Sequence, residues 1–184
     1  MGVRHTVTDS PVGSLTLVAD GAALIGLYFD GHSRPPRVPV GPRDDSGFDD
    51  AITQLGEYFA GTRTRFSLEL APRGSAFELA VWEQLLKIPY GETRTYRQLA
   101  VALGDPGGAQ AVGNANGWNP ISIIVPCHRV VGADGRLTGY AGGLSRKRFL
   151  LSLEEPPAED LGPPVLIASA ALPLTPEGSG VRGP

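Results

Sequence analysis

Cysteine is nearly absent from this sequence, because Cys127 is the only one among 184 residues. A single cysteine cannot form a disulfide within the chain or supply the several thiolates of a zinc cluster. A lone thiol persists in a reducing compartment, so we expect the protein in the cytoplasm. The chain also lacks a charged-then-apolar leader and any apolar run of membrane-spanning length, which predicts neither secretion nor membrane insertion.

Charged residues are also rather few, at 19%, and hydrophobic residues make up 41%, as in an ordinary globular protein. The net charge of −3 argues against a general nucleic-acid binder, but the charge is unevenly spread. Residues 86–150 contain eight basic and three acidic residues, whereas the rest of the chain is acidic. This asymmetry suits a partner that presents phosphates to one face. Ordinary solvated surface charge explains the same count equally well.

Residues 1–72 are predicted to form a small domain of strands with one helix. Turn signals separate apolar runs of strand length between residues 5 and 30, and a proline- and glycine-rich loop follows at 31–46. Apolar residues at helical spacing predict a helix over 48–59. The stretch RFSLELA, residues 65–71, is predicted as a further strand. None of these residues indicates a particular chemistry.

Residues 73–155 are predicted to form a mostly helical domain. Ser75 and Glu78 have the spacing of a capping box at the start of a helix. Two further helices, over 93–104 and 109–117, flank a glycine-containing turn, which is typical of a helix-turn-helix. The second helix of this pair has small side chains that allow close approach to another surface. Tight packing inside the protein is the alternative explanation.

The segment around the cysteine combines an apolar run with a break. Residues 121–125, ISIIV, are mostly β-branched and apolar and predict a buried strand that ends at Pro126. A glycine-rich loop follows, and residues 145–154 predict a basic amphipathic helix. The last residues, 156–184, are rich in proline and glycine and are predicted to be a flexible tail.

Cys127 is followed at once by His128 and Arg129, which changes its interpretation. A free cysteine is usually a small buried hydrophobic residue. A nucleophilic thiolate requires a nearby base or positive charge, and these two neighbours can supply both. Adjacent side chains on a strand point to opposite faces, so a direct contact between Cys127 and His128 requires a turn or a bridging water.

Four stretches of the sequence together resemble one family. They read PCHRV, IPYGETRTYRQLA, AVGNANGWNPISIIVPCHRVVG and LTGYAGGLSRKRFLL. In this order and spacing they resemble the C-terminal domain of the O6-alkylguanine-DNA alkyltransferases, also called methylated-DNA–protein-cysteine methyltransferases. The stretch SPVGSLTLV and the helix that ends in YFAG resemble the N-terminal domain of the same family.

The resemblance implies an α+β fold. A small N-terminal α/β unit, ribonuclease H-like with an antiparallel sheet, occupies residues 1–72. A mostly helical DNA-binding and alkyl-acceptor domain with a helix-turn-helix occupies residues 73–155, and residues 156–184 fall outside the resemblance. The implied activity is DNA repair by irreversible, stoichiometric transfer of an alkyl group from O6-alkylguanine in double-stranded DNA to the cysteine. No cofactor, metal or membrane is implied, and the expected protein is a monomer.

The family's catalytic residues can be assigned position by position. Cys127 matches the acceptor nucleophile, and His128 matches the histidine that activates it through a bound water. Glu154 matches the carboxylate that orients this histidine, as in hydrolase triads. Asn119 matches a buried asparagine that braces the turn before the cysteine. Tyr96 matches the tyrosine that aids rotation of the target nucleotide and protonation of the leaving guanine. Without the resemblance, Glu154 would be a helix-end charge and Tyr96 a core residue.

Further residues match the substrate pocket and the DNA-facing surface. Val130 matches a backbone carbonyl that reads the exocyclic amine of guanine. Tyr140 and Ala141 match the loop that walls the guanine pocket, with the Ala141 amide near the guanine oxygen. The predicted DNA-facing residues are Arg94, Tyr96, Arg97, Ala109, Gln110, Gly113 and Asn114.

Gln110 departs from the family pattern, in which this position is normally arginine. The arginine enters the base stack and fills the space of the flipped base, and glutamine lacks its charge and stacking plane. A lesion-binding sensor or regulatory protein with weak transfer activity is therefore an alternative function. A cysteine hydrolase that uses Cys127, His128 and Glu154 is a third interpretation, distinguished by repeated turnover.

Overall fold

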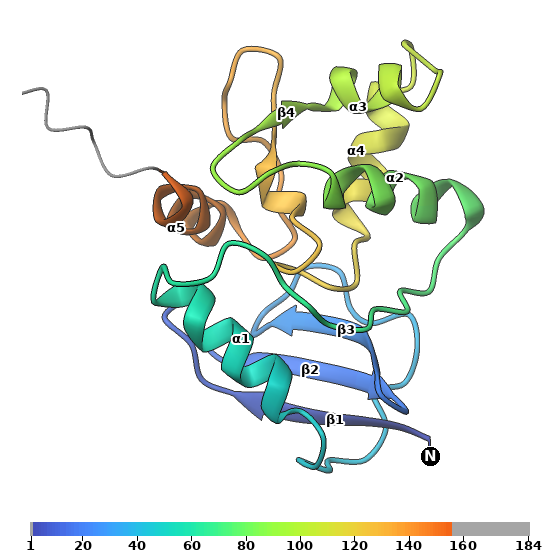
Figure 1. Cartoon of the computed structure of the whole chain (residues 1–184). Coiled ribbons are helices and arrows are strands. Elements are labelled where there is room, and N and C mark those ends of the chain that lie inside the picture. Colours follow the sequence, from blue (N-terminus) through green and yellow to red (C-terminus); the bar gives the residue numbers. More distant parts are fainter. Residues whose placement is uncertain (1, 156–184) are drawn as a thin grey trace, which may run out of the picture.

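The computed structural model describes residues 2–155 and begins with a three-stranded antiparallel sheet. Its strands are β1 (Val3–Thr8), β2 (Leu15–Asp20) and β3 (Ala23–Phe29), in that order across the sheet. Helix α1 (Asp49–Phe59) packs against one face of the sheet (Figure 1). All seven residues of β3 are buried, as expected for a strand covered on both faces.

The rest of the described chain is mostly helical. Three helices, α2 (Ala76–Leu86), α3 (Tyr96–Ala102) and α4 (Ala109–Gly117), contact one another. A 3₁₀ turn, η1 (Cys127–Arg129), leads into β5 (Val130–Val131), which pairs in parallel with β4 (Arg94–Thr95). Helix α5 (Leu144–Glu154) ends beside η1 (Figure 1). The sheet followed by helices confirms the predicted α+β class.

Local sequence explains where the second group of helices begins. The capping box predicted for α2 is present, with the Ser75 hydroxyl accepting from the Glu78 amide and the Glu78 carboxylate accepting from the Ser75 amide. A second capping box, formed by Thr95 and Gln98, starts α3. Between α3 and α4 the chain reverses at Gly104, whose φ of +81° favours glycine. This turn produces the helix-turn-helix.

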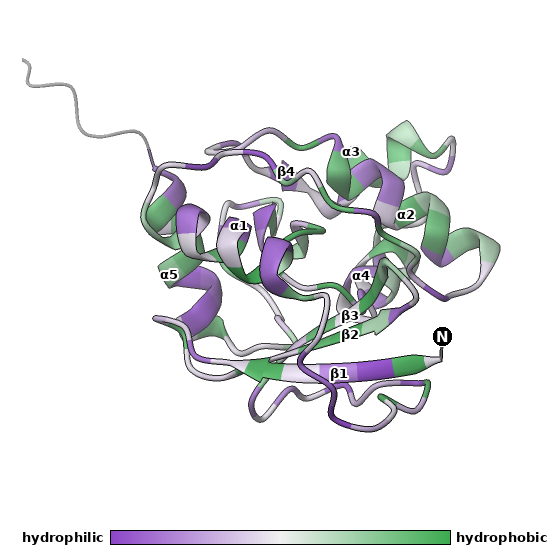
Figure 2. Ribbon diagram, turned by 60° about the horizontal axis from the view of Figure 1, so that its bottom comes forward, coloured by the Kyte–Doolittle hydropathy of each residue, from purple (hydrophilic) through white to green (hydrophobic). Residues whose placement is uncertain are grey.

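The sheet and the helices share one hydrophobic core. The core cluster runs from Leu15 and Leu27 in the sheet to Val81 in α2 and Leu150 in α5. The edge of β3 that faces away from β2 bonds to the segment before the cysteine. The Leu27 amide donates to the Pro120 carbonyl, and the Leu27 carbonyl accepts from the Ser122 amide. Figure 2 shows the mixed hydropathy of α1 and α5, both of which bury one side. The position of the cysteine therefore depends on the N-terminal sheet.

The prediction of a buried strand over residues 121–125 is wrong in secondary structure, although all five residues are buried. Only Ile121 forms a bridge, to Leu27. The chain then turns, with the Val125 amide donating to the Ile121 carbonyl, and Ile123 has a φ of +70°. Burial alone produced the strand-like pattern, because a short apolar run reads the same in a strand and in a buried turn.

The prediction of a strand over residues 65–71 is also mostly wrong. The segment is extended, but only Leu70 pairs with the sheet, in a parallel bridge to Leu24. Gln54 of α1 takes the place of a partner strand, donating to the Ser67 carbonyl and accepting from the Ser67 amide. The alternation of polar and apolar residues is real and correctly predicts which side chains face the core, but it does not specify a partner.

No helix within residues 2–155 has both the length and the apolar character needed to cross a membrane. The predicted tail, residues 156–184, lies outside the described residues.

Candidate active site

Cys127 is the first residue of η1 and its side chain is almost fully buried. The thiol sulfur accepts a hydrogen bond from Asn119 Nδ2 at 3.0 Å, and the Cys127 carbonyl accepts one from Asn116 Nδ2 at 3.4 Å. Burial raises the pKa of the thiol, while the Asn119 hydrogen bond and the Lys147 charge lower it. Because burial is the largest effect, the resting side chain is a protonated thiol that needs a base before it can act.

Asn119 braces the turn that carries the cysteine. Its Nδ2 also donates to the Val125 carbonyl at 2.8 Å, and its Oδ1 accepts from the Ile121 amide at 3.0 Å. The turn needs such support, because a buried β-branched residue at positive φ, here Ile123, is strained. One asparagine therefore fixes both the backbone before Cys127 and the position of its sulfur.

The His128 side chain reaches Glu154 of α5. Its Nε2 lies 2.8 Å from Glu154 Oε1, and both side chains are buried. A nitrogen bonded to a carboxylate carries the proton, which leaves Nδ1 as the basic atom of the neutral ring. Nδ1 is buried and has no protein hydrogen-bond partner among residues 2–155. Burial lowers the pKa of His128 and the bond to Glu154 raises it, so the ring is neutral at rest.

Glu154, at the C-terminal end of α5, accepts hydrogen bonds from side chains of two elements, α1 and η1. Its Oε1 accepts from His128, from Tyr58 Oη of α1 at 2.7 Å and from an Arg129 nitrogen at 2.9 Å. Its Oε2 accepts from Arg129 Nε at 2.7 Å. Burial alone would raise the pKa of this carboxyl, but the bonds from His128 and Arg129 prevail and lower it to about 2. Glu154 is therefore a fixed negative charge.

Lys147 brings a buried positive charge near the thiol. Its Nζ donates to the carbonyls of Val130 at 2.5 Å and Thr138 at 3.0 Å, and its side chain is fully buried. Burial lowers its pKa to about 8, while the nearby Cys127 raises it. The lysine thus joins β5 to the glycine-rich loop, and its charge favours the thiolate over the thiol.

The glycine-rich loop and α3 meet beside the cysteine. The Thr138 hydroxyl donates to Tyr96 Oη at 3.2 Å, and Tyr96 packs against Gly113 of α4. Tyr140 lies edge-on to Phe29 of β3, with ring centroids 5.9 Å apart. The Ala141 carbonyl accepts from the Ser33 amide at 2.9 Å, which ties the loop to the N-terminal unit. Tyr96 comes from α3, whereas Tyr140 and Ala141 are neighbours in the glycine-rich loop, so two separate parts of the chain form this region.

Helix α4 presents its small and polar residues outward. Gln110 and Asn114 are exposed, Ala109 and Gly113 are half-buried, and Val112 and the following turn pack inward. Asn114 accepts a hydrogen bond from Arg34 at 3.3 Å. On α3 and β4, Arg97 is exposed, whereas Arg94 forms a salt bridge to Glu92 at 2.8 Å.

The charge asymmetry of residues 86–150 is only partly a surface property. Arg129 is buried and paired with Glu154, and Lys147 is fully buried, so neither contributes to an exposed basic face. Arg146 donates to the Val12 and Gly142 carbonyls, which places it against the N-terminal unit. The sequence count thus overstates the positive surface, because it cannot tell solvated charges from buried ones.

Several site residues carried no recognised signal in the sequence. Tyr58 bonds to Glu154, Asn116 holds the Cys127 carbonyl, and Lys147 holds the Val130 carbonyl. Lys147 was counted with the basic residues of 86–150, and Tyr58 lies within an ordinary amphipathic helix. Arg129 was predicted as a positive charge for the thiolate, but in the structure it pairs with Glu154. Within residues 2–155, no group of three or more histidine, cysteine or acidic side chains has the arrangement of a metal site.

Two family models match nearly all of the described chain. The ribonuclease-like domain of 6-O-methylguanine DNA methyltransferase matches residues 3–72, and the DNA-binding domain of the same enzyme matches residues 76–156. Among curated relatives, the methylated-DNA–protein-cysteine methyltransferase of Mycobacterium tuberculosis H37Rv is 50% identical over 153 residues, covering 83% of this chain and 93% of that one. The Methanosarcina barkeri enzyme of the same name is 46% identical over 152 residues, covering 82% and 96%.

Solved structures agree with the family models. A crystal structure of the M. tuberculosis O6-methylguanine methyltransferase has a TM-score of 0.78 at 50% identity, covering 85% of this chain and 96% of that one. A structure of the M. tuberculosis protein in complex with DNA also has a TM-score of 0.78, at 52% identity, covering 82% and 92%. The predicted resemblance is confirmed: this chain belongs to the 6-O-methylguanine DNA methyltransferase family.

Proposed function

We propose that this protein repairs DNA by moving the alkyl group of an O6-alkylguanine onto the sulfur of Cys127, once per protein molecule. The observation that carries the proposal is the buried Cys127 thiol, held by Asn119 next to the His128–Glu154 pair. The DNA-binding domain of the family supports DNA as the partner, bound as a duplex that contains the lesion. No cofactor takes part in this reaction.

The target base must leave the duplex before it can meet the thiol. Extruding a nucleotide costs a few kcal/mol, and least for a poorly paired lesion. The exposed side of α4, with Gln110 and Asn114, is the surface proposed to enter the groove, and Tyr96 lies between this helix and the glycine-rich loop. Tyr96 is therefore placed to guide the rotating nucleotide toward Cys127.

The proton of the thiol is the first obstacle, because burial holds Cys127 in its neutral form. The proposed base is His128 Nδ1. A water molecule between the Cys127 sulfur and this nitrogen carries the proton from one to the other. The resulting imidazolium is stabilised by Glu154, which remains ionised because its pKa is about 2. The Lys147 charge stabilises the thiolate that forms.

The thiolate then attacks the alkyl carbon in line with the bond to O6. A carbon–sulfur bond forms, the carbon–oxygen bond breaks, and its electron pair stays on the guanine. Tyr96 Oη and the Ala141 amide are proposed as the donors that stabilise this developing charge. The Val130 carbonyl, which Lys147 holds in place, and the Tyr140 ring are proposed to recognise the guanine itself. The thioether product is stable, so the protein is consumed.

Intact-protein mass spectrometry tests the proposal directly. Mixing the protein with a duplex that contains one O6-methylguanine should add the mass of one methylene group and then stop at one equivalent. Continued release of free product would support the cysteine hydrolase instead. Binding of the lesion without any mass increase would support a damage sensor, the alternative that the replacement of arginine by Gln110 motivates.

Replacing the nucleophile tests the assignment of the cysteine. Cys127→Ser should abolish the mass increase, because a hydroxyl beside the same histidine is a far weaker nucleophile. Affinity for the lesion duplex should remain close to that of the wild type, since Cys127 is buried and the substitution leaves the exposed side of α4 unchanged. Methyl transfer that persists in this variant would overturn the assignment.

A further inference from the structure

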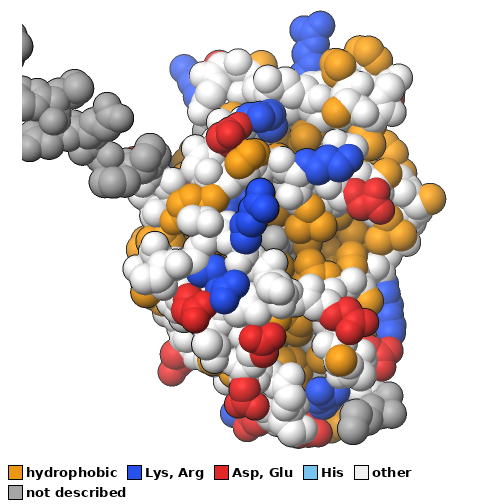
Figure 3. All heavy atoms as spheres, viewed as in Figure 1, with side chains coloured by type: hydrophobic (Ala, Val, Ile, Leu, Met, Phe, Trp, Pro, Cys, Tyr) orange, Lys and Arg blue, Asp and Glu red, His pale blue; other side chains and the backbone are white. Residues whose placement is uncertain are grey.

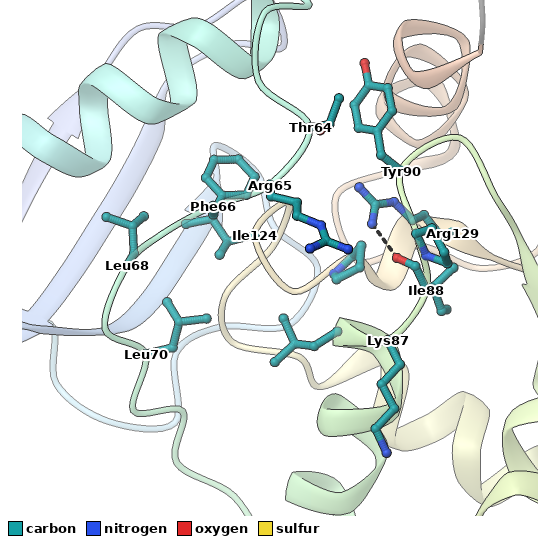
Figure 4. A pocket seen from close by; sticks show the side chains of 13 residues that line it. Thr64, Arg65, Phe66, Leu68, Leu70, Lys87, Ile88, Tyr90, Ile124 and Arg129 are labelled. Atoms are coloured by element: carbon teal, nitrogen blue, oxygen red, sulfur yellow. Dashed lines mark hydrogen bonds between the residues drawn. The ribbon is translucent and has the colours of Figure 1, made fainter.

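A groove separates the extended segment 64–70 from the chain that follows α2, and Cys127 is not among the residues that line it. Its volume is about 520 Å³. Phe66, Leu68 and Leu70 form one wall, and Ile88 and Tyr90 lie across from them (Figure 4). In the space-filling view a hollow lined with hydrophobic side chains and flanked by basic ones is visible on this side of the molecule (Figure 3).

One edge of the extended segment has no partner. In an extended chain, the N–H and C=O groups of successive residues point to alternate sides. The Ser67 main chain is bonded to Gln54, and the groups of Glu69 and Ala71 bond to Leu24 of β3. Residues 66, 68 and 70 therefore present their main-chain groups on the side away from β3.

These outward groups lack protein partners in the described part of the chain. No hydrogen bond involving the main chain of Phe66, Leu68 or Leu70 occurs within residues 2–155. Their side chains are only half-buried, although each packs against the core. An extended edge beside an apolar groove is the arrangement that accepts an added strand, which supplies main-chain bonds and places alternate side chains in the groove.

The groove also carries positive charge at its rim. Arg65 extends across it and Lys87 lies at the end of α2 (Figure 4). Neither forms a salt bridge among the described residues, whereas the third cation that lines the groove, Arg129, is neutralised by Glu154. An occupant with an apolar run and nearby carboxylates fits this combination.

The sequence contains such an occupant close by. Residues 165–172 read VLIASAAL, a run without proline that is bounded by Pro164 and Pro173. It is β-branched and apolar at its start, and every residue in it has the N–H that strand pairing needs. Glu159 and Asp160 precede it.

The point where the described chain ends is adjacent to the groove. Tyr90, which lines the groove, donates from its hydroxyl to the Leu153 carbonyl at 3.0 Å, two residues before Glu155. The nine residues 156–164 can span up to roughly 30 Å, which is long enough for residue 165 to reach the groove from the end of α5. Attachment to the same chain also gives the run an effective concentration on the order of millimolar, without any need for a second molecule.

We propose that residues 165–172 of this chain dock in the groove as an added strand along Phe66, Leu68 and Leu70, with Glu159 and Asp160 facing Arg65 and Lys87. Strand addition satisfies the unpaired main-chain groups and covers the apolar wall. Pro126 and Arg129 line the groove but Cys127 does not, so the docking can be tested independently of the proposed transfer reaction.

Residue-resolved amide hydrogen exchange of the full-length protein tests the docking. Protection from exchange should alternate along segment 66–71, because only every second residue has main-chain groups that face the added strand. The amides of Phe66, Leu68 and Leu70 should exchange at least about tenfold more slowly in the wild type than in an Ile167→Asp variant, whose buried charge prevents docking. The amides of Ser67 and Ala71, already bonded within the fold, should not change.

A matched variant, Ser179→Asp, adds the same charge outside the run and should behave as the wild type. Equal exchange at residues 66, 68 and 70 in the wild type and in Ile167→Asp would overturn the proposal. Protection that grows with protein concentration, together with a doubled mass in light scattering, would also overturn it, because the run would then come from a second copy.

Discussion

Glu154 is the residue on which most of the active-site charges converge. Its carboxylate accepts from Tyr58, His128 and Arg129, and these side chains come from α1, η1 and η1 respectively. A buried carboxylate with several donors has little tendency to take up a proton, so it serves as a fixed counter-charge rather than as a base. The proton acceptor of the relay is therefore Nδ1 of the neutral His128 ring.

This arrangement predicts a loss of stability in acid. The pKa of Glu154 is about 2 in the folded protein against an ordinary 4.5, so its contribution is fully present above about pH 4.5 and is lost as the pH falls toward 2. The shift corresponds to a contribution on the order of 3 kcal/mol. The low pKa of His128 acts in the same direction, because the folded state disfavours its charged form. Chemical denaturation at a series of pH values measures this slope.

The variant Glu154→Gln isolates the carboxylate. It should lose about 3–5 kcal/mol at neutral pH, because Arg129 is left buried without its counter-charge, and its stability should fall less steeply in acid. The exposed neighbour provides the control, and Glu155→Gln should match the wild type. An unchanged acid slope in Glu154→Gln would show that other groups cause the acid sensitivity.

At the scale of elements, the helix pair and the turn before the cysteine differ in how far sequence could predict them. The helices were predictable because capping residues and apolar spacing are local signals, as at Ser75 and Glu78. The turn at 121–125 was not, since its conformation depends on Asn119 and on pairing with β3. The strand prediction for residues 65–71 was wrong for a related reason, because a strand pattern does not reveal whether a partner strand exists.

The two arginines near the helix pair should contribute unequally to DNA binding. Arg97 is exposed and pairs with no acidic side chain among residues 2–155, whereas Glu92 already neutralises Arg94. Arg97→Gln should weaken binding to all duplex sequences and reduce the salt slope by up to about 0.9 for one lost phosphate contact. Arg94→Gln should have a smaller effect. Affinities measured over a range of salt concentrations test this, and a salt slope unchanged from the wild type in both variants would move the DNA-facing surface elsewhere.

Gln110, on the exposed side of α4, should limit base extrusion rather than chemistry. Gln110→Arg should increase the rate of transfer from duplex DNA by roughly fivefold, because arginine adds a stacking and cation–π contact worth about 1 kcal/mol. The rate with free O6-benzylguanine should change much less, because a free base needs no extrusion. The comparison requires second-order rate constants for both substrates in both proteins. An equal increase with both substrates would place the effect in the pocket.

At the scale of the whole molecule, the sheet and the helices behave as one structure even though each matches its own family model. Leu27 bonds to the segment before Cys127, Tyr58 bonds to Glu154, and the Ser33 amide bonds to Ala141. These three links reach the cysteine turn, the relay and the pocket loop. Sequence motifs identify the catalytic residues of the second half, but they do not show that the first half holds each of them in place.

One cooperative unfolding transition should therefore be shared by both halves. Leu55 of α1 is buried in the common core, and Leu55→Ala should destabilise the protein by about 2–5 kcal/mol. Both tryptophans, Trp82 and Trp118, lie in the second half, so their fluorescence reports on the helices. The fluorescence transition in denaturant should shift as much as the transition followed by circular dichroism, while the exposed control Thr53→Ala should shift neither. A fluorescence transition that stays at its wild-type position would mean that the helices fold independently of the sheet, and the three links would then be contacts between separate domains.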